Sequence, residues 1–203
     1  MSMTNLNPSP DRQIILNNIS WNTYERLLTE QSSSGAHLNY DQGSLEIMIL
    51  SLQHERLKHR LSTLVELIAR ERGLVVEGAG STTFRRADAA KGFEPDACFY
   101  FAHAEHISTR DEINLTVDPA PELVIEIDIT HHSLNKLPIF AAFGVSEIWR
   151  HDGRMVTIHL LDNASYRESP ESRLLPGITG VLLTEWVRTN RKQPHPAWQL
   201  AKQ

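Results

Sequence analysis

Apolar residues dominate positions 123–129, where Glu126 and Asp128 are the only charged residues. A stretch of this length predicts a β-strand, and side chains two residues apart on a strand point to the same face. We therefore expect Glu126 and Asp128 to share one face of this strand, with Leu and Ile side chains covering the other. Shorter apolar stretches predict further strands at 14–19, 74–77 and 96–101.

Two pairs of apolar stretches are separated by short turn sequences that contain glycine, and each pair predicts a β-hairpin. The first hairpin joins 37–41 to 44–50, and the second joins 146–150 to 155–161. Glu46 is a carboxylate on the otherwise apolar second arm of the first hairpin.

Apolar residues recur at helical spacing most clearly over residues 53–72, and Gly73 follows as the expected stop. From His54 to Arg72 this helix carries five Arg or Lys residues against three Glu, although the whole chain has a net charge of −5. Further helices are predicted at 20–31, at 133–143 with Ser133 as N-cap and Gly144 as the stop, and near 184–190.

The order of these elements is typical of an α+β domain in which a mixed β-sheet lies beside the two long helices. The chain has 203 residues, of which 40% are hydrophobic, and this suffices for one domain with a sizeable core. We expect a loose leader at 1–12, a single domain at 13–190 and a tail at 191–203.

Composition excludes several classes of protein. The one cysteine, Cys98, cannot form an internal disulfide, which favours a reducing cytoplasm. The polar N-terminus does not resemble a signal peptide, and no stretch approaches the roughly 20 apolar residues of a membrane helix. The negative net charge argues against a protein that coats nucleic acid nonspecifically, but it is compatible with an enzyme that has a local basic face and an acidic metal site.

Three carboxylates occupy positions where burial makes a charge costly. Asp96 follows Pro95 and opens an apolar strand, while Glu126 and Asp128 interrupt another. Burying an unpaired carboxylate costs several kcal/mol, so these residues require a cation or hydrogen-bond donors. Magnesium prefers oxygen ligands and needs only one or two protein carboxylates. The pattern therefore predicts a magnesium site.

Lys136 is the candidate for a lysine that orients water or stabilises negative charge in such a site. We expect it in the first turn of the helix at 133–143, where a cation opposes the helix dipole. That position is unfavourable by a few tenths of a kcal/mol, which suggests a local partner. The alternative interpretation is a solvated surface lysine.

Several further residues have two interpretations. Glu46 is either an additional ligand or an exposed acid on an edge strand, and the second is slightly favoured. His54 and Glu55 either approach an anionic substrate or only start the basic helix, and again the second is favoured. The basic residues of that helix either contact a phosphate backbone or form a solvated face; they are Arg56, Lys58 and Arg60.

The ordered set of motifs resembles the PD-(D/E)XK nuclease superfamily. Within it, the chain is similar to the putative restriction-endonuclease domain family, long catalogued as a domain of unknown function. The matching stretches lie at 40–48, 54–55, 95–96, 121–126 and 136–149, and the last contains Gly-Val-Ser-Glu-Ile-Trp.

The resemblance implies a restriction-endonuclease-like core, in which helices flank a mixed sheet, with an N-terminal helix and hairpin as an extension. It also implies a Mg²⁺ or Mn²⁺ site at Asp96 and Glu126, DNA as the partner, and a homodimer. The superfamily motif places lysine at position 128, where this chain has Asp128. In this family a lysine from the following helix is thought to substitute, and Lys136 fits that role.

Three functions follow from these observations. The first is a divalent-metal-dependent endonuclease that hydrolyses phosphodiester bonds in DNA, with Asp128 as an added ligand. The second is a catalytically inactive binding or interaction module on a nuclease fold, which the missing lysine at 128 favours. The third is a metal-free hydrolase with two carboxylates; it is the weakest, because two acids on one strand face suit a shared cation better.

Overall fold

The computed structural model describes residues 11–30, 35–129 and 134–189. Its strands are β1 (Arg12–Leu16), β2 (His37–Asp41), β3 (Ser44–Ile49), β4 (Glu77–Gly78), β5 (Phe84–Arg86), β6 (Lys91–Phe93), β7 (Ala97–Tyr100), β8 (Leu123–Ile127), β9 (Glu147–His151), β10 (Val156–Asp162) and β11 (Ser165–Ser169). Its helices are α1 (Trp21–Glu30), α2 (Leu52–Glu71), α3 (Ala104–Ile107), α4 (Leu137–Phe143) and α5 (Gly180–Thr189).

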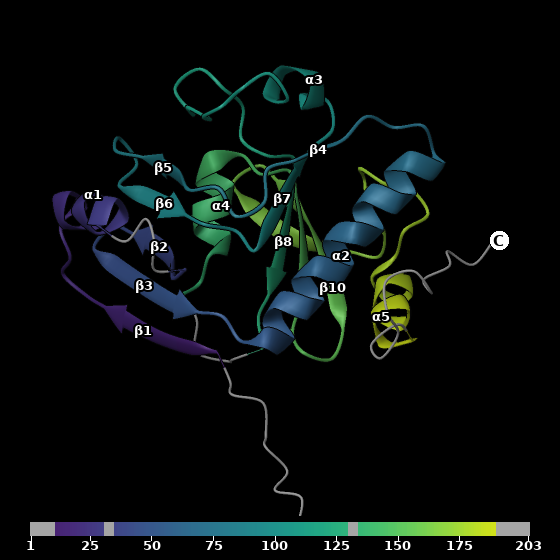
Figure 1. Ribbon diagram of the computed structural model, residues 1–203, viewed down its shortest axis with the longest axis horizontal. Coiled ribbons are helices and arrows are strands. Elements are labelled where there is room, and N and C mark those ends of the chain that lie inside the picture. Colours follow the sequence, from purple (N-terminus) through teal and green to yellow (C-terminus); the bar gives the residue numbers. More distant parts are fainter. Residues whose placement is uncertain (1–10, 31–34, 130–133, 190–203) are drawn as a thin grey trace, which may run out of the picture.

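The described strands form two sheets. A six-stranded sheet has the order β11-β10-β9-β8-β7-β4, and a five-stranded sheet has the order β1-β3-β2-β6-β5. The only parallel pair in the described strands is β8 with β9, which makes the larger sheet mixed. The smaller sheet lies to one side of the larger one and α1 covers part of it, whereas α2 crosses one face of the larger sheet (Figure 1). The fold is therefore α+β, as the sequence predicts.

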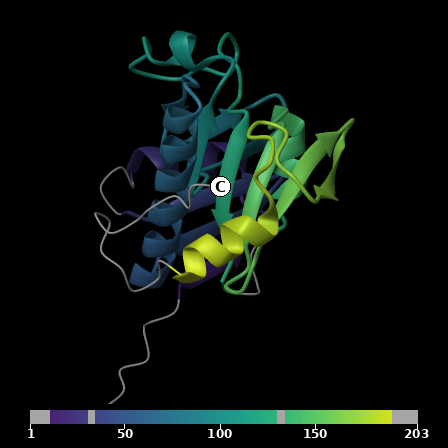
Figure 2. The same cartoon turned by 90° about the vertical axis from the view of Figure 1, so that its right-hand side faces the viewer.

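The central helix α2 forms where the apolar spacing is strongest. Ser51 caps its N-terminus by accepting a hydrogen bond of 3.2 Å from the backbone N–H of His54. Gly73 follows its last turn with a φ of 64°, a left-handed conformation that favours glycine. The buried stripe of α2 packs on β8, and α5 lies next to α2 (Figure 2). This arrangement places the N-terminus of α2 near the C-terminal ends of β8 and β9.

The two faces of β8 pack against different elements. Leu123, Ile125 and Ile127 face α2 and α5 in the largest hydrophobic cluster. Val124 points the other way and packs with buried residues of α4 and β6. Glu126 follows Val124 by two residues and therefore lies on the α4 face. This alternation directs the Glu126 carboxylate into the space between the two sheets.

Several boundaries differ from expectation. Of the strand expected at 74–77 only Glu77 is in a strand, as the first residue of β4, and the strand expected at 14–19 is found earlier, as β1. Strand β1 starts inside the expected leader, and Asp11 is buried. Residues 1–10 and the whole of the expected tail at 191–203 lie outside the described residues. The short elements β5, β6, β11 and α3 are additions, and α5 is longer than the helix expected near 184–190.

The helix expected at 133–143 begins later. Its first residue is Leu137, Pro138 stands in its first turn, and Lys136 is the N-cap. The proposed cap Ser133 lies outside the described residues. Gly144 ends the helix with a φ of 80°, as expected. No helix in the described part of the chain is both long and apolar enough to cross a membrane.

Candidate metal and nuclease site

Glu126 and Lys136 form a buried ion pair between β8 and the start of α4. Glu126 is 5% exposed, and its Oε2 contacts the Lys136 ammonium. The Oε1 atom of Glu126 is buried and has no hydrogen-bond partner among the described residues. A buried carboxylate oxygen without a donor is costly, so this atom is a candidate ligand for a cation.

Asp96 lies immediately before β7 and is held from two sides. Its Oδ2 accepts a hydrogen bond of 2.6 Å from the backbone N–H of Ile127. Its Oδ1 lies 2.8 Å from Nε2 of His54, a fully buried residue in the first turn of α2. These contacts fix the Asp96 carboxylate beside β8, within electrostatic range of Glu126 and Lys136.

His54 connects Asp96 to a second buried acid. Its Nδ1 lies 3.0 Å from Oδ2 of Asp11, and Oδ1 of Asp11 accepts a 2.7 Å hydrogen bond from the Ser51 N–H. Burial lowers the pKa of His54, but hydrogen bonds and charge from Asp11 and Asp96 outweigh this and raise the pKa to about 9. His54 is therefore an imidazolium between two carboxylates at neutral pH.

The charges around Glu126 shift its protonation. Burial is the largest effect and raises the pKa of Glu126 to about 7, and the nearby Asp96 and Glu46 carboxylates add to it against the attraction of Lys136. Burial lowers the pKa of Lys136, but the carboxylates of Glu126, Asp96 and Glu46 raise it above its ordinary value. The Lys136 ammonium thus lies among three acids, one of which, Asp96, also contacts the His54 imidazolium.

Glu46 is part of this cluster and is fully buried, so the expectation of an exposed acid on an edge strand is wrong. Strand β3 lies between β1 and β2 in the smaller sheet, and is therefore not an edge strand. Oε2 of Glu46 accepts a 3.0 Å hydrogen bond from the Asn39 side chain, and Oε1 accepts one of 2.8 Å from the Leu134 N–H. With both oxygens occupied, Glu46 contributes charge and orientation.

The expected three-carboxylate cluster of Asp96, Glu126 and Asp128 is not formed. Strand β8 ends at Ile127, and the Asp128 carboxylate pairs with the Arg150 guanidinium. Within the described ranges, no group of three Asp, Glu, His or Cys side chains is arranged to hold a metal ion. We therefore leave Asp128 out of the ion site proposed below, although it lines the same pocket as Glu126.

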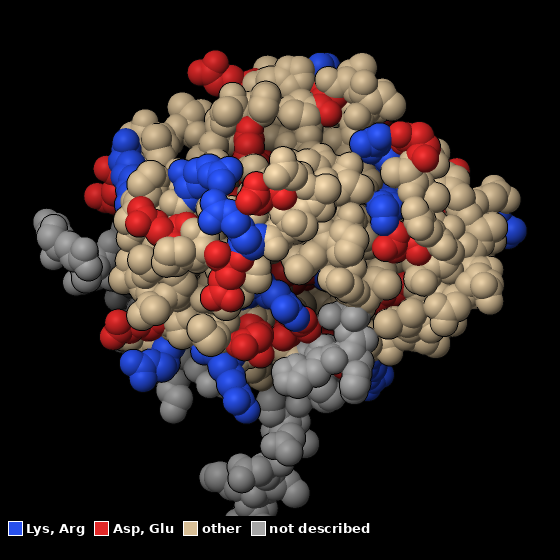
Figure 3. Space-filling model, turned by 180° about the vertical axis from the view of Figure 1, so that it is seen from behind, with Lys and Arg blue, Asp and Glu red and all other residues tan. Residues whose placement is uncertain are grey.

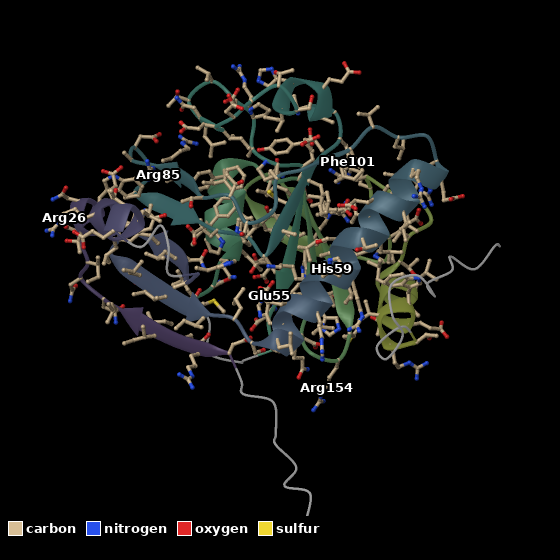
Figure 4. The ribbon with its side chains drawn as sticks, in the orientation of Figure 1. Arg26, Glu55, His59, Arg85, Phe101 and Arg154 are labelled. Carbon is tan, nitrogen blue, oxygen red and sulfur yellow. The ribbon has the colours of Figure 1, made fainter. Side chains whose placement is uncertain are left out.

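The residues of α2 expected near the site line two different pockets. Glu55 pairs with Lys58, at 2.6 Å between Oε2 and Nζ, as helix neighbours three residues apart often do. Both residues line a shallow pocket that also contains Asp96. Arg56 borders that pocket and a second one, which Arg60 also lines. Figure 4 shows Glu55 on the N-terminal half of α2.

A pocket of about 440 Å³ gives access to the ion pair. Its charged groups come from five residues, and apolar residues of β3 and α4 form part of its wall; the charged residues are Glu126, Asp128, Lys136, Arg150 and Asp152. The residues fit a divalent cation, because Glu126 offers a buried oxygen without a donor and Asp96 is fixed next to it.

Two residues of the site carry no signal in the sequence. Asp11 lies in a polar N-terminal segment, and Asn39 lies on a strand whose pairing brings it next to Glu46. Asn39 also accepts a 3.1 Å hydrogen bond at Oδ1 from the N–H of Glu94. Their roles depend on contacts between segments far apart in the chain.

A mixed sheet with flanking helices is the architecture of the restriction-endonuclease-like fold. The chain belongs to the Uma2 family, described as "Putative restriction endonuclease", whose model matches residues 21–189. This confirms the family that the sequence motifs indicate.

A solved structure supports the same fold. The chain is similar to a protein from Anabaena variabilis ATCC 29413 described as a putative nuclease belonging to DUF820, with a TM-score of 0.57 and 14% identity. The match covers 83% of this chain and 99% of that one. At this identity the likeness shows the fold alone. None of the curated proteins matches the chain.

Proposed function

We propose that this protein is a divalent-metal-dependent endonuclease that hydrolyses phosphodiester bonds in DNA. The observation that carries the proposal is the Glu126 carboxylate, which is buried beside Lys136 and Asp96 with one oxygen lacking a donor. Membership of a family of putative restriction endonucleases supports the reaction class.

Asp96 and Glu126 are the residues that would hold Mg²⁺ or Mn²⁺. When bound, such an ion supplies an activated water and neutralises charge on the phosphoryl oxygens. Asp96 reaches the site in a fixed orientation, because the Ile127 N–H and His54 occupy its outer side. Glu46 orients the segment before α4 by accepting a hydrogen bond from the Leu134 N–H.

Lys136 is the third catalytic residue of the proposal. Its ammonium lies against Glu126 at the pocket wall and remains protonated, because the surrounding carboxylates raise its pKa. From the N-cap of α4 it is placed to orient the attacking water or to stabilise negative charge on a phosphate in the pocket. This is the role that the superfamily motif gives to lysine at position 128.

Nicking of supercoiled plasmid DNA tests the proposal. The wild-type protein is expected to nick the plasmid with Mg²⁺ or Mn²⁺ and not with EDTA. The nicking rate should fall at least 100-fold in each of three variants, because each loses one electrostatic catalytic group. These variants are Asp96→Ala, Glu126→Gln and Lys136→Met. Glu168→Gln, at an exposed acid of β11, is the matched control and should nick like wild type. Wild type that cleaves no DNA with either ion would refute the proposal.

A binding module on a catalytically inactive nuclease fold is the second candidate. It is favoured by the contacts of Asp96, whose two oxygens already have His54 and the Ile127 N–H as partners. Titration calorimetry with Mn²⁺ separates the two functions. No heat of binding in wild type, together with an unaltered fold in Glu126→Ala, would support the inactive module.

A nuclease that cuts both DNA strands often pairs two subunits, one for each strand. We therefore also expect a homodimer, which the resemblance implies as well. Light scattering of the purified protein would give twice the 23.0 kDa mass of the chain. A monomer at all concentrations would limit the proposed activity to nicking.

A further inference from the structure

A second pocket, of about 360 Å³, lies beside α2 and is lined by four arginines and by no Asp or Glu. These residues are Arg56, Arg60, Arg154 and Arg188. In a chain with a net charge of −5, four cations around one cavity are a marked local excess. A cluster of cations with no acid in the pocket lining is the electrostatic signature of an anion-binding surface.

The fold brings these arginines together from three separate elements. Arg56 and Arg60 lie one turn apart on α2, Arg188 is in the last turn of α5, and Arg154 is on the turn between β9 and β10. Figure 4 shows Arg154 near the N-terminal end of α2. The packing of α5 next to α2 therefore brings together basic groups that are distant in the sequence.

Three of the four pocket arginines are available to a ligand. Arg56, Arg154 and Arg188 are exposed, and none of the three has an ion pair with any residue that the structure describes. Surface arginines elsewhere pair with acids, as Arg26 does with Glu30 at 3.5 Å. On the face opposite α2, basic and acidic side chains lie side by side (Figure 3).

The arginine pocket adjoins the proposed catalytic site on two sides. At the end of β9 and in the turn after it, Arg150 and Asp152 line the pocket that contains Glu126, whereas His151 and Arg154 line the arginine pocket. Arg56 lines both the arginine pocket and the shallow pocket that contains Asp96. The C-terminal end of β9 and the turn after it therefore border both pockets.

We infer that the arginine pocket binds the phosphate backbone of the nucleic-acid strand whose scissile bond lies between Asp96 and Glu126. The inference rests on the proposed function and names how the substrate is held. Guanidinium groups suit phosphate because their donors form a fork that matches its oxygens. One phosphate monoester carries at most about two negative charges, so four arginines match several linked phosphates better than one free anion.

The salt dependence of DNA binding tests this inference without any cleavage. A fluorescein-labelled 20-base-pair duplex is titrated in EDTA, with fluorescence anisotropy as the readout, at several salt concentrations. The variant Arg154→Ala/Arg188→Ala is compared with the matched double variant Arg26→Ala/Arg167→Ala, which removes two exposed arginines from α1 and β11. Circular dichroism and thermal melting confirm that each variant is folded.

The pocket variant should bind at least tenfold more weakly than wild type at 100 mM salt. Its slope of log K against log salt should be shallower by about 2, because each lost phosphate contact releases about 0.9 fewer counterions. The control variant should keep the affinity and slope of wild type. If the double variant does not fold, Arg188→Gln alone should lower the slope by about 1.

Equal affinity and slope in wild type and the pocket variant would overturn the inference, and so would wild type that binds no duplex. Millimolar inorganic phosphate and a mononucleotide are added as competitors. If both displace the duplex with equal potency, the pocket binds single phosphates, and the assignment of a nucleic-acid strand as its ligand is overturned. Because the titration contains no metal, its outcome is independent of nicking. A protein that binds through these arginines but nicks nothing would refute the proposed activity and leave the inference standing.

Discussion

Replacement of His54 by alanine should destabilise the protein strongly, and by an amount that depends on pH. The change removes a fully buried cation from between Asp11 and Asp96, which are themselves 7% and 4% exposed. Removing one partner of a buried ionic network costs about 3–5 kcal/mol, because it leaves buried charge without compensation. The control is Glu66→Ala, at an exposed residue on the same helix, which should change stability by less than about 0.5 kcal/mol.

The pKa of His54 gives a second value for the stability that its charge contributes. An increase from 6.5 to about 9 corresponds to about 3 kcal/mol of stability. Because the folded pKa is raised, this contribution is fully present below pH 6.5 and is lost as pH rises through about 9. The stability difference between wild type and His54→Ala should therefore be largest at pH 6 and shrink by about 3 kcal/mol at pH 10.

Urea unfolding in EDTA at the two pH values measures this difference. EDTA keeps metal binding from contributing to the stability of either protein. A difference that is the same at pH 6 and pH 10 would refute the charged state of His54. A difference below 1 kcal/mol at pH 6 would refute the buried network itself.

Two further predictions concern the core. Burial raises the pKa of the Cys98 thiol to about 12, so at pH 8 only about one thiol in 10,000 is ionised. Cys98 should therefore react with a disulfide reagent only after the protein is unfolded in guanidinium. Rapid labelling of the native protein would contradict its burial. Gly180→Ala should lower stability by about 1–3 kcal/mol in chemical denaturation, since a Cβ there would lie 2.4 Å from the backbone oxygen of Val156. The roughly 1 kcal/mol gain in helix propensity does not offset this clash, and a variant as stable as wild type would show that the backbone can shift.

The sequence predicts the elements whose patterns are long. The spacing in α2, the two hairpins and the β8 strand are all found close to their expected positions. The strands of two or three residues, β4, β5 and β6, are too short for a period to be visible. They form because the partner strands in the two sheets supply their hydrogen bonds.

The site is only partly predictable from the sequence, because part of it depends on contacts between segments that are distant in the chain. Local patterns identify Asp96, Glu126 and Lys136 as candidates, and alternation places Asp128 in the same pocket as Glu126. Alternation does not reveal that the Asp128 carboxylate pairs with Arg150 of the neighbouring strand. The burial of Glu46 depends on β3 having a strand on both sides, and no local pattern distinguishes a central strand from an edge strand. The interaction of Asp11 with His54 joins residues 43 positions apart.

The most direct test of the proposed site is a crystal structure with Mn²⁺, in which anomalous scattering locates the ion. Asp96 and Glu126 are predicted to contact the anomalous peak through carboxylate oxygens, with the Lys136 ammonium beside it, and Glu126→Gln should lose the peak. A peak at Asp128 and Asp152 alone, or none in crystals of wild type at millimolar Mn²⁺, would contradict the account.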